Sequence, residues 1–357
     1  MKIIQIMPEF GLAGAEIMCE NLIYQQVKQG NQVVAISLYD YHSPITERLE
    51  AENIPVVYLG KKPGLDVSII RKLIHIFKQE RPDVIHTHRY VMQYAIPAAK
   101  IVGIKRRVHT IHSIAIKENE RLARKLAKHF YHHNGVVPVA LSTLIQDSVM
   151  EEYDLSRDRI PVIFNGINLD RCISKLSYQV GSVFTIVHIG RFMDAKNHMG
   201  LLMAFQSFHE KYPNTVLQLI GDGELRLQIE EYIREHNLES AVELLGLQSN
   251  VYQFLSRADM FTLPSLWEGI PMTLIEAMGT GLPIVTTNVG GIPDMLTDGE
   301  SALIVDAEAD QLAAAFEKCY LSETLRETLG QNAKMRSVEF SAEHMANEYL
   351  KVYQREV

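Results

Sequence analysis

Short apolar segments, rich in β-branched residues, alternate with longer amphipathic segments along the whole chain. Before residue 170 they predict strands at Lys2–Met7, Gln32–Leu38, Val56–Leu59, Asp83–Thr87, Arg107–Ile111, Val136–Leu141 and Pro161–Phe164. After residue 170 they predict strands at Phe184–Ile189, Val216–Ile220, Val242–Leu245, Met260–Leu263, Pro283–Thr286 and Ala302–Val305. Because buried parallel strands read as continuous apolar runs separated by helices, this pattern predicts parallel sheets covered on both faces.

Segments with helical periodicity lie between the predicted strands, among them Ala15–Gln29, Val67–Gln79, Gly200–Lys211 and Glu224–Asn237. A polar stretch with little periodicity, Asn168–Ser182, separates the two strand series. We therefore expect an α/β chain of two doubly wound, Rossmann-like domains, at residues 1–170 and 171–341. The last helical pattern lies within residues 342–357, and we expect it to cross back to the first domain.

The composition is that of an ordinary soluble globular protein, with 47% hydrophobic and 22% charged residues. The cysteines Cys19, Cys172 and Cys319 are far apart and form no CxxC pair. This spacing favours a reducing compartment and disfavours a disulfide framework or a zinc site. The N-terminus is too soon interrupted, at Pro8, for a signal peptide, and no run of about 18 apolar residues occurs. We therefore expect a cytoplasmic protein.

Charge is distributed unevenly along the chain. The first 174 residues carry 22 Lys and Arg against 18 Asp and Glu, a net +4, whereas the rest carry 13 against 25, a net −12. The basic segment Lys117–His133 predicts either a helix that rests on an anionic membrane or acidic partner, or an ordinary solvated helix face. We expect no nucleic-acid partner.

The first domain offers a glycine loop and a group of histidines as candidate ligand contacts. Gly11 and Gly14 precede the first predicted helix, whose N-terminus favours an anion. The loop is not a GxGxxG fingerprint, so dinucleotide binding is disfavoured. His86, His88, His109 and His112 follow strand ends without an acid or cysteine at ligand spacing, which disfavours a metal site. We expect His112 to bond a substrate hydroxyl and the other three to be structural.

A pair of cations follows the first strand of the second domain. Arg191 and Lys196 lie in the loop before the next helix, and both side chains suit a diphosphate. Because no D-x-D sequence occurs in the chain, an acid pair for Mg²⁺ or Mn²⁺ is not expected. An ordinary surface pair is the alternative. We expect the following loop, residues 221–224, to be mainly structural, and residues 246–251 to be a candidate seat for a nucleobase.

Glu268 and Glu276 lie eight positions apart, separated by a predicted helix start at Pro271. Three backbone amides of the first helical turn are then expected to be free for an anion or a hydroxyl, those of Met272, Thr273 and Leu274. The two acids span about 12 Å if the segment is helical. Hydrolase carboxylate pairs stand about 5–9.5 Å apart, so two contacts along an extended ligand fit better than an acid–base pair.

At this point the sequence resembles a known family over nearly its whole length. The residues that carry the resemblance are GLAGAE, DVIHTH, HTIHS, FNGIN, GRFMDAKNH, GDGE and SLWEGIPMTLIEAMGTGLPIVTTNVGGIPDML. They are similar to the retaining glycosyltransferases of family 4, also called glycosyl transferases group 1. The resemblance implies the GT-B fold, in which two Rossmann-like domains face an interdomain cleft.

The resemblance also implies a role for each matched residue. Gly14 would contact the donor diphosphate, and His112 would bond a hydroxyl of the donor sugar. Arg191 and Lys196 would hold the diphosphate as it leaves. Glu268, with Gly269 and the amides of Met272, Thr273 and Leu274, would hold the sugar, and Glu276 would bind the ribose hydroxyls. One departure is that the usual Gly-Gly reads Ala13-Gly14 here, which puts the approach of that loop in question.

The implied activity is that of a retaining, metal-independent hexosyltransferase that uses a nucleotide sugar, a UDP-sugar by frequency in the family, and no cofactor. The acceptor would be a glycan or lipid-linked glycan in bacterial surface polysaccharide biosynthesis, reached from the cytoplasm at the inner face of the membrane. A nucleotide-sugar epimerase on the same scaffold is the alternative, and a non-catalytic nucleotide-sugar binder is a third reading.

Overall fold

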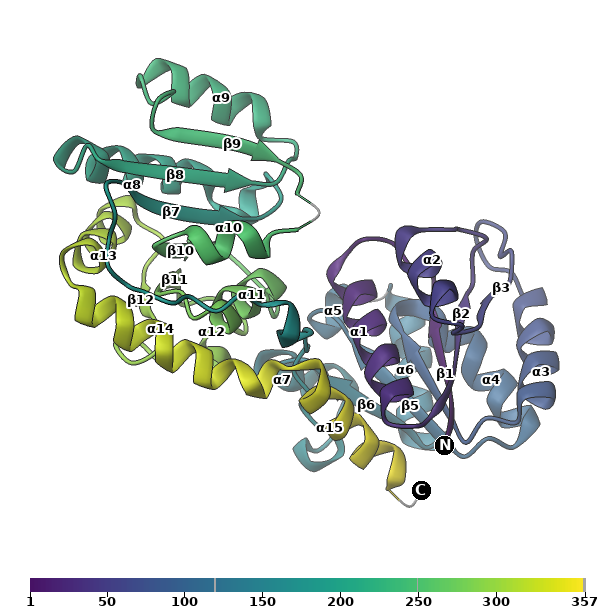
Figure 1. Cartoon of the computed structure of the whole chain (residues 1–357). Coiled ribbons are helices and arrows are strands. Elements are labelled where there is room, and N and C mark those ends of the chain that lie inside the picture. Colours follow the sequence, from purple (N-terminus) through teal and green to yellow (C-terminus); the bar gives the residue numbers. More distant parts are fainter. Residues whose placement is uncertain (119, 249, 356–357) are drawn as a thin grey trace. The chain divides into compact units, whose positions relative to one another are not determined.

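The computed structural model describes residues 1–118, 120–248 and 250–355. The chain forms two compact units. Unit 1 comprises Met1–Gly166 together with the C-terminal segment that starts at Ala342, and unit 2 comprises Ile167–Ser341. Figure 1 shows the helices and strands of each unit.

Over the described part of unit 1, six parallel strands form one sheet in the order β3-β2-β1-β4-β5-β6. The strands are β1 (Lys2–Met7), β2 (Gln32–Ser37), β3 (Val56–Tyr58), β4 (Val84–His88), β5 (Arg106–Ile111) and β6 (Val136–Ala140). The α-helices are α1 (Gly14–Lys28), α2 (Pro44–Ala51), α3 (Ser68–Glu80), α4 (Met92–Val102), α5 (Ala115–Glu118), α6 (Arg121–His133), α7 (Thr143–Tyr153) and α15 (Ala342–Gln354). Short 3₁₀ turns are η1 (Arg89–Val91) and η2 (Arg157–Arg159).

The described part of unit 2 also has a six-stranded parallel sheet, in the order β12-β11-β10-β7-β8-β9. The strands are β7 (Phe184–Ile189), β8 (Thr215–Ile220), β9 (Val242–Gly246), β10 (Met260–Leu263), β11 (Ile284–Thr287) and β12 (Leu303–Val305). The α-helices are α8 (His198–Lys211), α9 (Arg226–Glu235), α10 (Tyr252–Arg257), α11 (Met272–Thr280), α12 (Ile292–Met295), α13 (Ala309–Leu321) and α14 (Glu323–Ser337). The 3₁₀ turns are η3 (Leu169–Arg171), η4 (Asp194–Lys196) and η5 (Val338–Phe340).

The helices form where apolar positions recur at helical spacing, and they bury that face. In α3, Ile69, Leu73 and Phe77 recur every four residues and are fully buried, while the other side chains of the helix are partly or fully exposed. Burying such a side chain stabilises the fold by about 1.5–3 kcal/mol each. No helix in the described residues combines the length and the apolar character needed to cross a membrane.

One predicted strand is wrong. The segment Pro161–Phe164 forms no strand, although Val162 makes a single bridge to Ala140 at the end of β6. The backbone contact is limited to two hydrogen bonds, from Ala140 N to Pro161 O at 3.0 Å and from Ile163 N to Ala140 O at 2.9 Å. Proline has no amide hydrogen to continue the ladder, so the apolar run passes the sheet edge without extending it.

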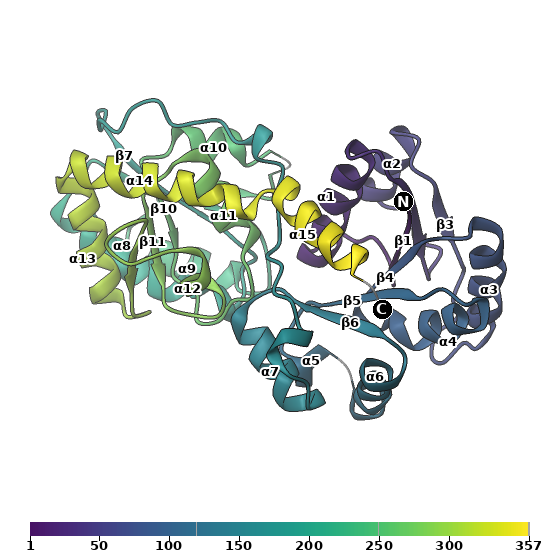
Figure 2. The same ribbon diagram turned by 90° about the horizontal axis from the view of Figure 1, so that it is seen from below.

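The helix α15 belongs to unit 1 and lies beside α1 (Figure 2). Its side chains Tyr349 and Tyr353 are 0% and 1% exposed. Both hydroxyls enter a buried hydrogen-bond network, because Tyr353 lies 2.7 Å from His86 Nδ1 and Tyr349 lies 2.7 Å from Thr110 Oγ1. The helix is therefore part of the core of unit 1.

Candidate active site

Two of the predicted site residues, Lys196 and Glu268, form an ion pair at the carboxyl edge of the unit 2 sheet. Nζ of Lys196 lies 2.5 Å from Oε1 of Glu268, although 72 positions separate the residues. The side chains are 16% and 10% exposed. The hydroxyl of Ser265 donates to the same oxygen, also at 2.5 Å. A largely desolvated pair of this kind interacts more strongly than an exposed one.

Backbone contacts fix the loop that carries Lys196. Leu266 N donates to Ala195 O at 2.8 Å, which ties the end of η4 to the loop after β10. Asn197 has φ 53°, a left-handed conformation that asparagine tolerates, and its Oδ1 accepts from Gly200 N at 3.2 Å. This cap starts α8 immediately after Lys196, so the lysine is held between a strand end and a helix start.

A glycine in the next loop supports Glu268. Gly290 has φ 60°, and a Cβ there would stand 1.9 Å from the carbonyl oxygen of Glu268. Gly291 N donates to Gly269 O at 3.0 Å, and the Thr287 hydroxyl donates to Ser265 O at 2.6 Å. Only glycine permits this conformation and this approach. No role was predicted for Gly290 or Ser265, although the pair Gly290-Gly291 begins only three residues after β11.

Arg191 lies in the β7–α8 loop with its side chain 70% exposed, and its Nη2 lies 3.2 Å from Oε2 of Glu224. Its backbone is fixed more firmly than its side chain, because Phe192 N donates to Asp222 O at 3.0 Å. Gly223 permits the approach, since a Cβ there would stand 2.4 Å from Phe192 O. This close packing gives residues 221–224 the structural role expected from the sequence, and it adds Glu224 as a partner that the sequence did not indicate.

The N-terminus of α11 differs from the prediction in two details. Pro271 is the cap residue rather than the first helical residue, with φ −75° and ψ 116°. The amide of Leu274 is not free, because it donates to Pro271 O at 3.1 Å. Among the described residues we find no acceptor for the amides of Met272 and Thr273. Two of the three predicted donors therefore remain available at the positive end of the helix.

Glu276 lies on the second turn of α11 and is partly buried. The hydroxyl of Tyr252 donates to its Oε1 at 3.2 Å. Burial raises the pKa of Glu276 to about 7, while Tyr252 and the charge of Arg171 act in the opposite direction. The guanidinium of Arg171 stands 4.9 Å from the centre of the Tyr252 ring. Neither partner was indicated by the sequence, because both lie more than twenty positions away.

The candidate nucleobase segment, residues 246–251, can be followed only in part because Ser249 lies outside the described residues. Beyond it, the backbone amide of Tyr252 donates to Asn250 Oδ1 at 3.2 Å. The start of α10, and with it the Tyr252 hydroxyl that contacts Glu276, is therefore set by this asparagine.

In unit 1, Gly14 is the first residue of α1, and the helix has no side-chain cap. A Cβ at Gly14 would meet no atom within 4 Å, and the same holds at Gly269 in unit 2. Neither glycine has a positive φ, so the fold itself does not require glycine at these positions. Ala13 has φ −114° and ψ 171°, extended backbone that alanine adopts without strain. The substitution of Ala13 for the family's glycine is therefore compatible with this loop.

His112 follows β5, and its Nε2 lies 3.0 Å from Nδ1 of His88. Burial lowers the pKa of His112 to about 3. His86, His88 and His109 are fully buried, and each has a hydrogen-bond partner within the unit 1 core. Within residues 1–118, 120–248 and 250–355, no three His, Cys, Asp or Glu side chains converge as a metal site would require.

The basic segment Lys117–His133 contains Asn119, which lies outside the described residues. The segment covers the end of α5 and all of α6. On α6, Leu122 is 81% exposed and lies beside the exposed basic residues Arg121 and Lys125. This part of α6 therefore combines an exposed apolar side chain with positive charge.

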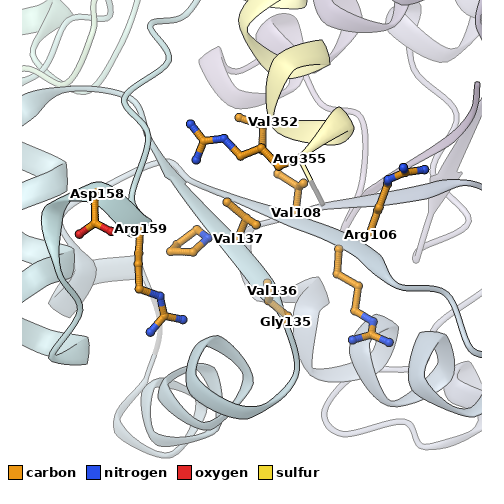
Figure 3. A pocket seen from close by; sticks show the side chains of 11 residues that line it. Arg106, Val108, Gly135, Val136, Val137, Asp158, Arg159, Val352 and Arg355 are labelled. Atoms are coloured by element: carbon orange, nitrogen blue, oxygen red, sulfur yellow. The ribbon is translucent and has the colours of Figure 1, made fainter. Parts of the chain in front are cut away.

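A cavity of about 240 Å³ in unit 1 lies at the amino-terminal ends of β5 and β6, away from the strand ends that carry His88 and His112 (Figure 3). Its floor is apolar, with Val136 and Val137, and four arginines line it: Arg106, Arg107, Arg159 and Arg355. The guanidinium groups of Arg106, Arg159 and Arg355 point in different directions (Figure 3). They do not converge on one anion, so we do not assign a donor site to this cavity.

Comparison with known proteins places this site in a family. The model of Glycosyltransferase Family 4 matches residues 12–171, and the model of Glycosyl transferases group 1 matches residues 179–336. The chain belongs to this glycosyltransferase family. The residues of the Lys196–Glu268 pair both lie in the group 1 match.

Individual relatives support the assignment. One is the UDP-Gal:alpha-D-GlcNAc-diphosphoundecaprenol alpha-1,3-galactosyltransferase of Escherichia coli, 28% identical over 63% of this chain and 63% of the relative. Another is the uncharacterized glycosyltransferase MJ1059 of Methanocaldococcus jannaschii, 28% identical over 61% of this chain and 58% of the relative. The match thus spans less than two thirds of the length of these two relatives.

Among solved structures, the Anabaena protein HepE in complex with UDP is similar, with a TM-score of 0.83 and 19% identity. The similarity covers 98% of this chain and 99% of that chain. At this identity it shows the fold, and the GT-B prediction is confirmed.

Proposed function

We propose that this chain is a hexosyltransferase that moves a sugar from a UDP-sugar to a glycan or lipid-linked glycan, with retention of anomeric configuration. The observation that carries the proposal is the Lys196–Glu268–Ser265 cluster, which lies immediately before the open amides of α11. It places a cation, a carboxylate and free N–H donors together at the carboxyl edge of a parallel sheet, where such folds bind ligands.

Each group of the cluster has a different proposed contact with the donor. Oε1 of Glu268 already accepts from Lys196 and Ser265, and among the described residues Oε2 has no partner. Oε2 is therefore the oxygen that accepts hydroxyls of the donor sugar. Lys196 retains donor capacity beyond its bond to Glu268 and would hold a diphosphate oxygen. Because Lys196 compensates its charge, Glu268 is better suited to orient a sugar than to abstract a proton.

The rest of the donor would follow the same edge of unit 2. The amides of Met272 and Thr273 suit a phosphate oxygen at the positive end of α11. Glu276 suits the two ribose hydroxyls as a two-oxygen acceptor, and the exposed Arg191 adds a second cation for the diphosphate. From the family resemblance, Gly14 and His112 would contribute from unit 1, and these two roles remain predictions.

The proposed reaction requires no protein nucleophile. The bond between the anomeric carbon and the phosphate oxygen breaks, and its electron pair stays on the departing nucleoside diphosphate. The acceptor oxygen forms the new bond on the same face, and its proton passes to a phosphate oxygen of the leaving group. Lys196, Arg191 and the amides of α11 would stabilise the charge that develops on this group, so we propose that no metal ion and no cofactor is needed.

Names of relatives support the substrates. HepE was solved with UDP and with UDP-glucose, and the Escherichia coli relative is named for UDP-Gal and a diphosphoundecaprenol-linked acceptor. An acceptor of this kind is anchored in a membrane. We propose that the exposed start of α6, with Leu122, Arg121 and Lys125, contacts the membrane from the cytoplasmic side.

The test is a panel of UDP- and GDP-sugars incubated with and without a synthetic α-GlcNAc-diphosphate lipid, with release of nucleotide and the sugar product both measured. A transferase releases nucleotide much faster with the acceptor, and the anomeric proton coupling of the product reports retention. Change of the donor sugar without acceptor would indicate an epimerase. Donor binding without either reaction across the panel would contradict the proposed activity.

A further inference from the structure

A chain of buried hydrogen bonds leads from the core of unit 1 to His112. Gln5 Oε1 lies 3.0 Å from His88 Nε2, and His88 Nδ1 lies 3.0 Å from His112 Nε2. Gln5 and His88 are both fully buried. A neutral histidine ring carries a hydrogen on only one of its two nitrogens. The donor-to-acceptor direction of these hydrogen bonds therefore decides which nitrogen of His112 is protonated.

Two side chains behind Gln5, those of Gln26 and Tyr353, fix this direction. Gln5 Nε2 donates to Gln26 Oε1 at 3.1 Å and to the Tyr353 hydroxyl at 3.3 Å, and Gln26 Nε2 donates to the same hydroxyl at 3.1 Å. If both amides were reversed, two carbonyl oxygens would face the Tyr353 hydroxyl, which has one hydrogen. The orientation that satisfies every contact therefore turns Gln5 Oε1 toward His88.

A carbonyl oxygen can only accept, so the hydrogen between Gln5 and His88 must come from His88 Nε2. The thiol of Cys19 also faces this nitrogen, but at 3.7 Å it is the weaker partner. With Nε2 protonated, Nδ1 of a neutral His88 is an acceptor. His112 Nε2 must then supply the hydrogen between the two rings, and Nδ1 of His112 is left without one.

We propose that His88 is a positioning residue that holds His112 as the Nε2–H tautomer, so that Nδ1 of His112 accepts a hydrogen bond from a hydroxyl of the donor sugar. The part of this inference that concerns the sugar rests on the proposed function. The tautomer itself follows from contacts within unit 1. We find no partner for His112 Nδ1 among the described residues.

The surroundings keep both rings neutral. Burial holds the pKa of His88 well below its ordinary value, and the neighbouring rings of His86 and His112 and the charge of Arg89 act in the same direction. The guanidinium of Arg89 is itself paired with Glu16 at 3.1 Å. The hydrogen-bonded series Gln5–His88–His112, the relay, therefore stays in one protonation state at neutral pH.

A consequence for specificity follows. An acceptor nitrogen fits a sugar hydroxyl, which donates, and repels a carboxylate, which only accepts. We expect a donor whose contacted hydroxyl is replaced by a carboxylate to be used at least about tenfold less well than the hydroxylated donor, because an acceptor that faces an acceptor loses its hydrogen bond.

The direct test is two-bond ¹H–¹⁵N correlation of the full chain labelled with ¹⁵N-histidine, with His112 assigned from the signal that is lost in His112→Phe. The expected result is a single Nε2–H tautomer of His112 that does not titrate between pH 5.5 and 8. An Nδ1–H tautomer, or a protonated ring at neutral pH, would overturn the proposal. This measurement needs no substrate, so it can fail or succeed independently of the proposed activity.

Variants then test the role of His88. His88→Phe keeps a ring but no nitrogen, and we expect His112 to populate both tautomers and the donor KM to rise about tenfold with a smaller change in kcat. His88→Asn keeps an acceptor near the position of Nδ1, and we expect it to restore the Nε2–H signal. His109→Phe, on the neighbouring strand β5 and without a hydrogen bond to His88 or His112, is the matched control.

The kinetic measurements of KM and kcat use the UDP-sugar that supports the fastest nucleotide release. Loss of the Nε2–H signal in His88→Phe together with an unchanged KM would overturn the assignment of His112 Nδ1 to the sugar. An unchanged signal in His88→Phe would overturn the relay. If no donor supports release, the proposed function fails and the tautomer measurement still decides the relay.

Discussion

Replacing Glu276 with Gln is expected to stabilise unit 2 and at the same time to weaken nucleotide binding. The carboxyl lies on α11 where burial raises its pKa to about 7, from an ordinary value of 4.5. A raised pKa in the folded protein means that folding disfavours the charged form. The cost is fully present above pH 7 and disappears as the pH falls through 7 toward 4.5.

The size of the effect follows from the pKa. One pKa unit corresponds to about 1.36 kcal/mol, so a change from 4.5 to about 7 corresponds to about 3 kcal/mol at pH 8. Since the side chain retains some exposure, we expect about 2–3 kcal/mol from Glu276→Gln. For a unit of this size, that raises Tm by about 4–12 °C. The Tyr252 hydroxyl can still donate to the amide oxygen of the new side chain.

The assay is thermal unfolding of wild type and variant at pH 8 and pH 5, with isothermal titration of UDP at pH 8. We expect the rise in Tm at pH 8 to shrink to a small difference at pH 5, and UDP affinity to fall about tenfold through loss of a charge-assisted acceptor for the ribose. Glu239→Gln, at an exposed position of unit 2, is the control for removing a charge. An equal Tm shift at both pH values, or unchanged UDP affinity, would refute the reasoning.

Three further predictions test the site. Lys196→Ala should lower kcat by roughly 10²–10³-fold because it removes a cation from the leaving group. Lys211→Ala, at an exposed position where the lysine contacts Glu317 and the Tyr212 ring, should keep wild-type turnover, and equal kcat values for the two variants would refute the role of Lys196. Gly14→Ala should keep the wild-type Tm but weaken UDP binding in titration, because the methyl group enters open space. Gly290→Ala should lower Tm because its Cβ would overlap a carbonyl oxygen, and a larger loss of Tm in Gly14→Ala than in Gly290→Ala would contradict these roles. Exhaustive dialysis against EDTA should leave turnover unchanged, and a loss restored by Mg²⁺ or Mn²⁺ would contradict a metal-independent reaction.

The strands were predictable because each is a local apolar run with a turn on either side. β1, β7 and β10 have the predicted bounds, and nine other strands differ by one or two residues. Pro161–Phe164 failed because hydrophobicity does not report whether a neighbouring strand is present to pair with. The fold class thus follows from periodicity, whereas the length of each ladder depends on partners that are distant in sequence.

The site was predictable at residues whose chemistry and strand-end position agree, such as Lys196 and Glu268. It was not predictable where contacts depend on the folded backbone. Gly290 supports Glu268 from 22 positions away, and Tyr252 reaches Glu276 across 24 positions. The amide of Leu274 was predicted to be free because the first turn of an α-helix offers it no i−4 acceptor, but in the folded chain it makes a tighter i−3 hydrogen bond to Pro271 O.

The position of α15 in unit 1 has a consequence for biosynthesis. Ribosomes deliver all of unit 2 before they deliver Tyr349 and Tyr353, which complete the core around His86. Until then Gln5 and Gln26 lack the tyrosine hydroxyl that orients their amides. The nascent enzyme would therefore finish its second half before its first, and the histidine at its candidate sugar contact would acquire its hydrogen-bonding direction only after the last helix has left the ribosome.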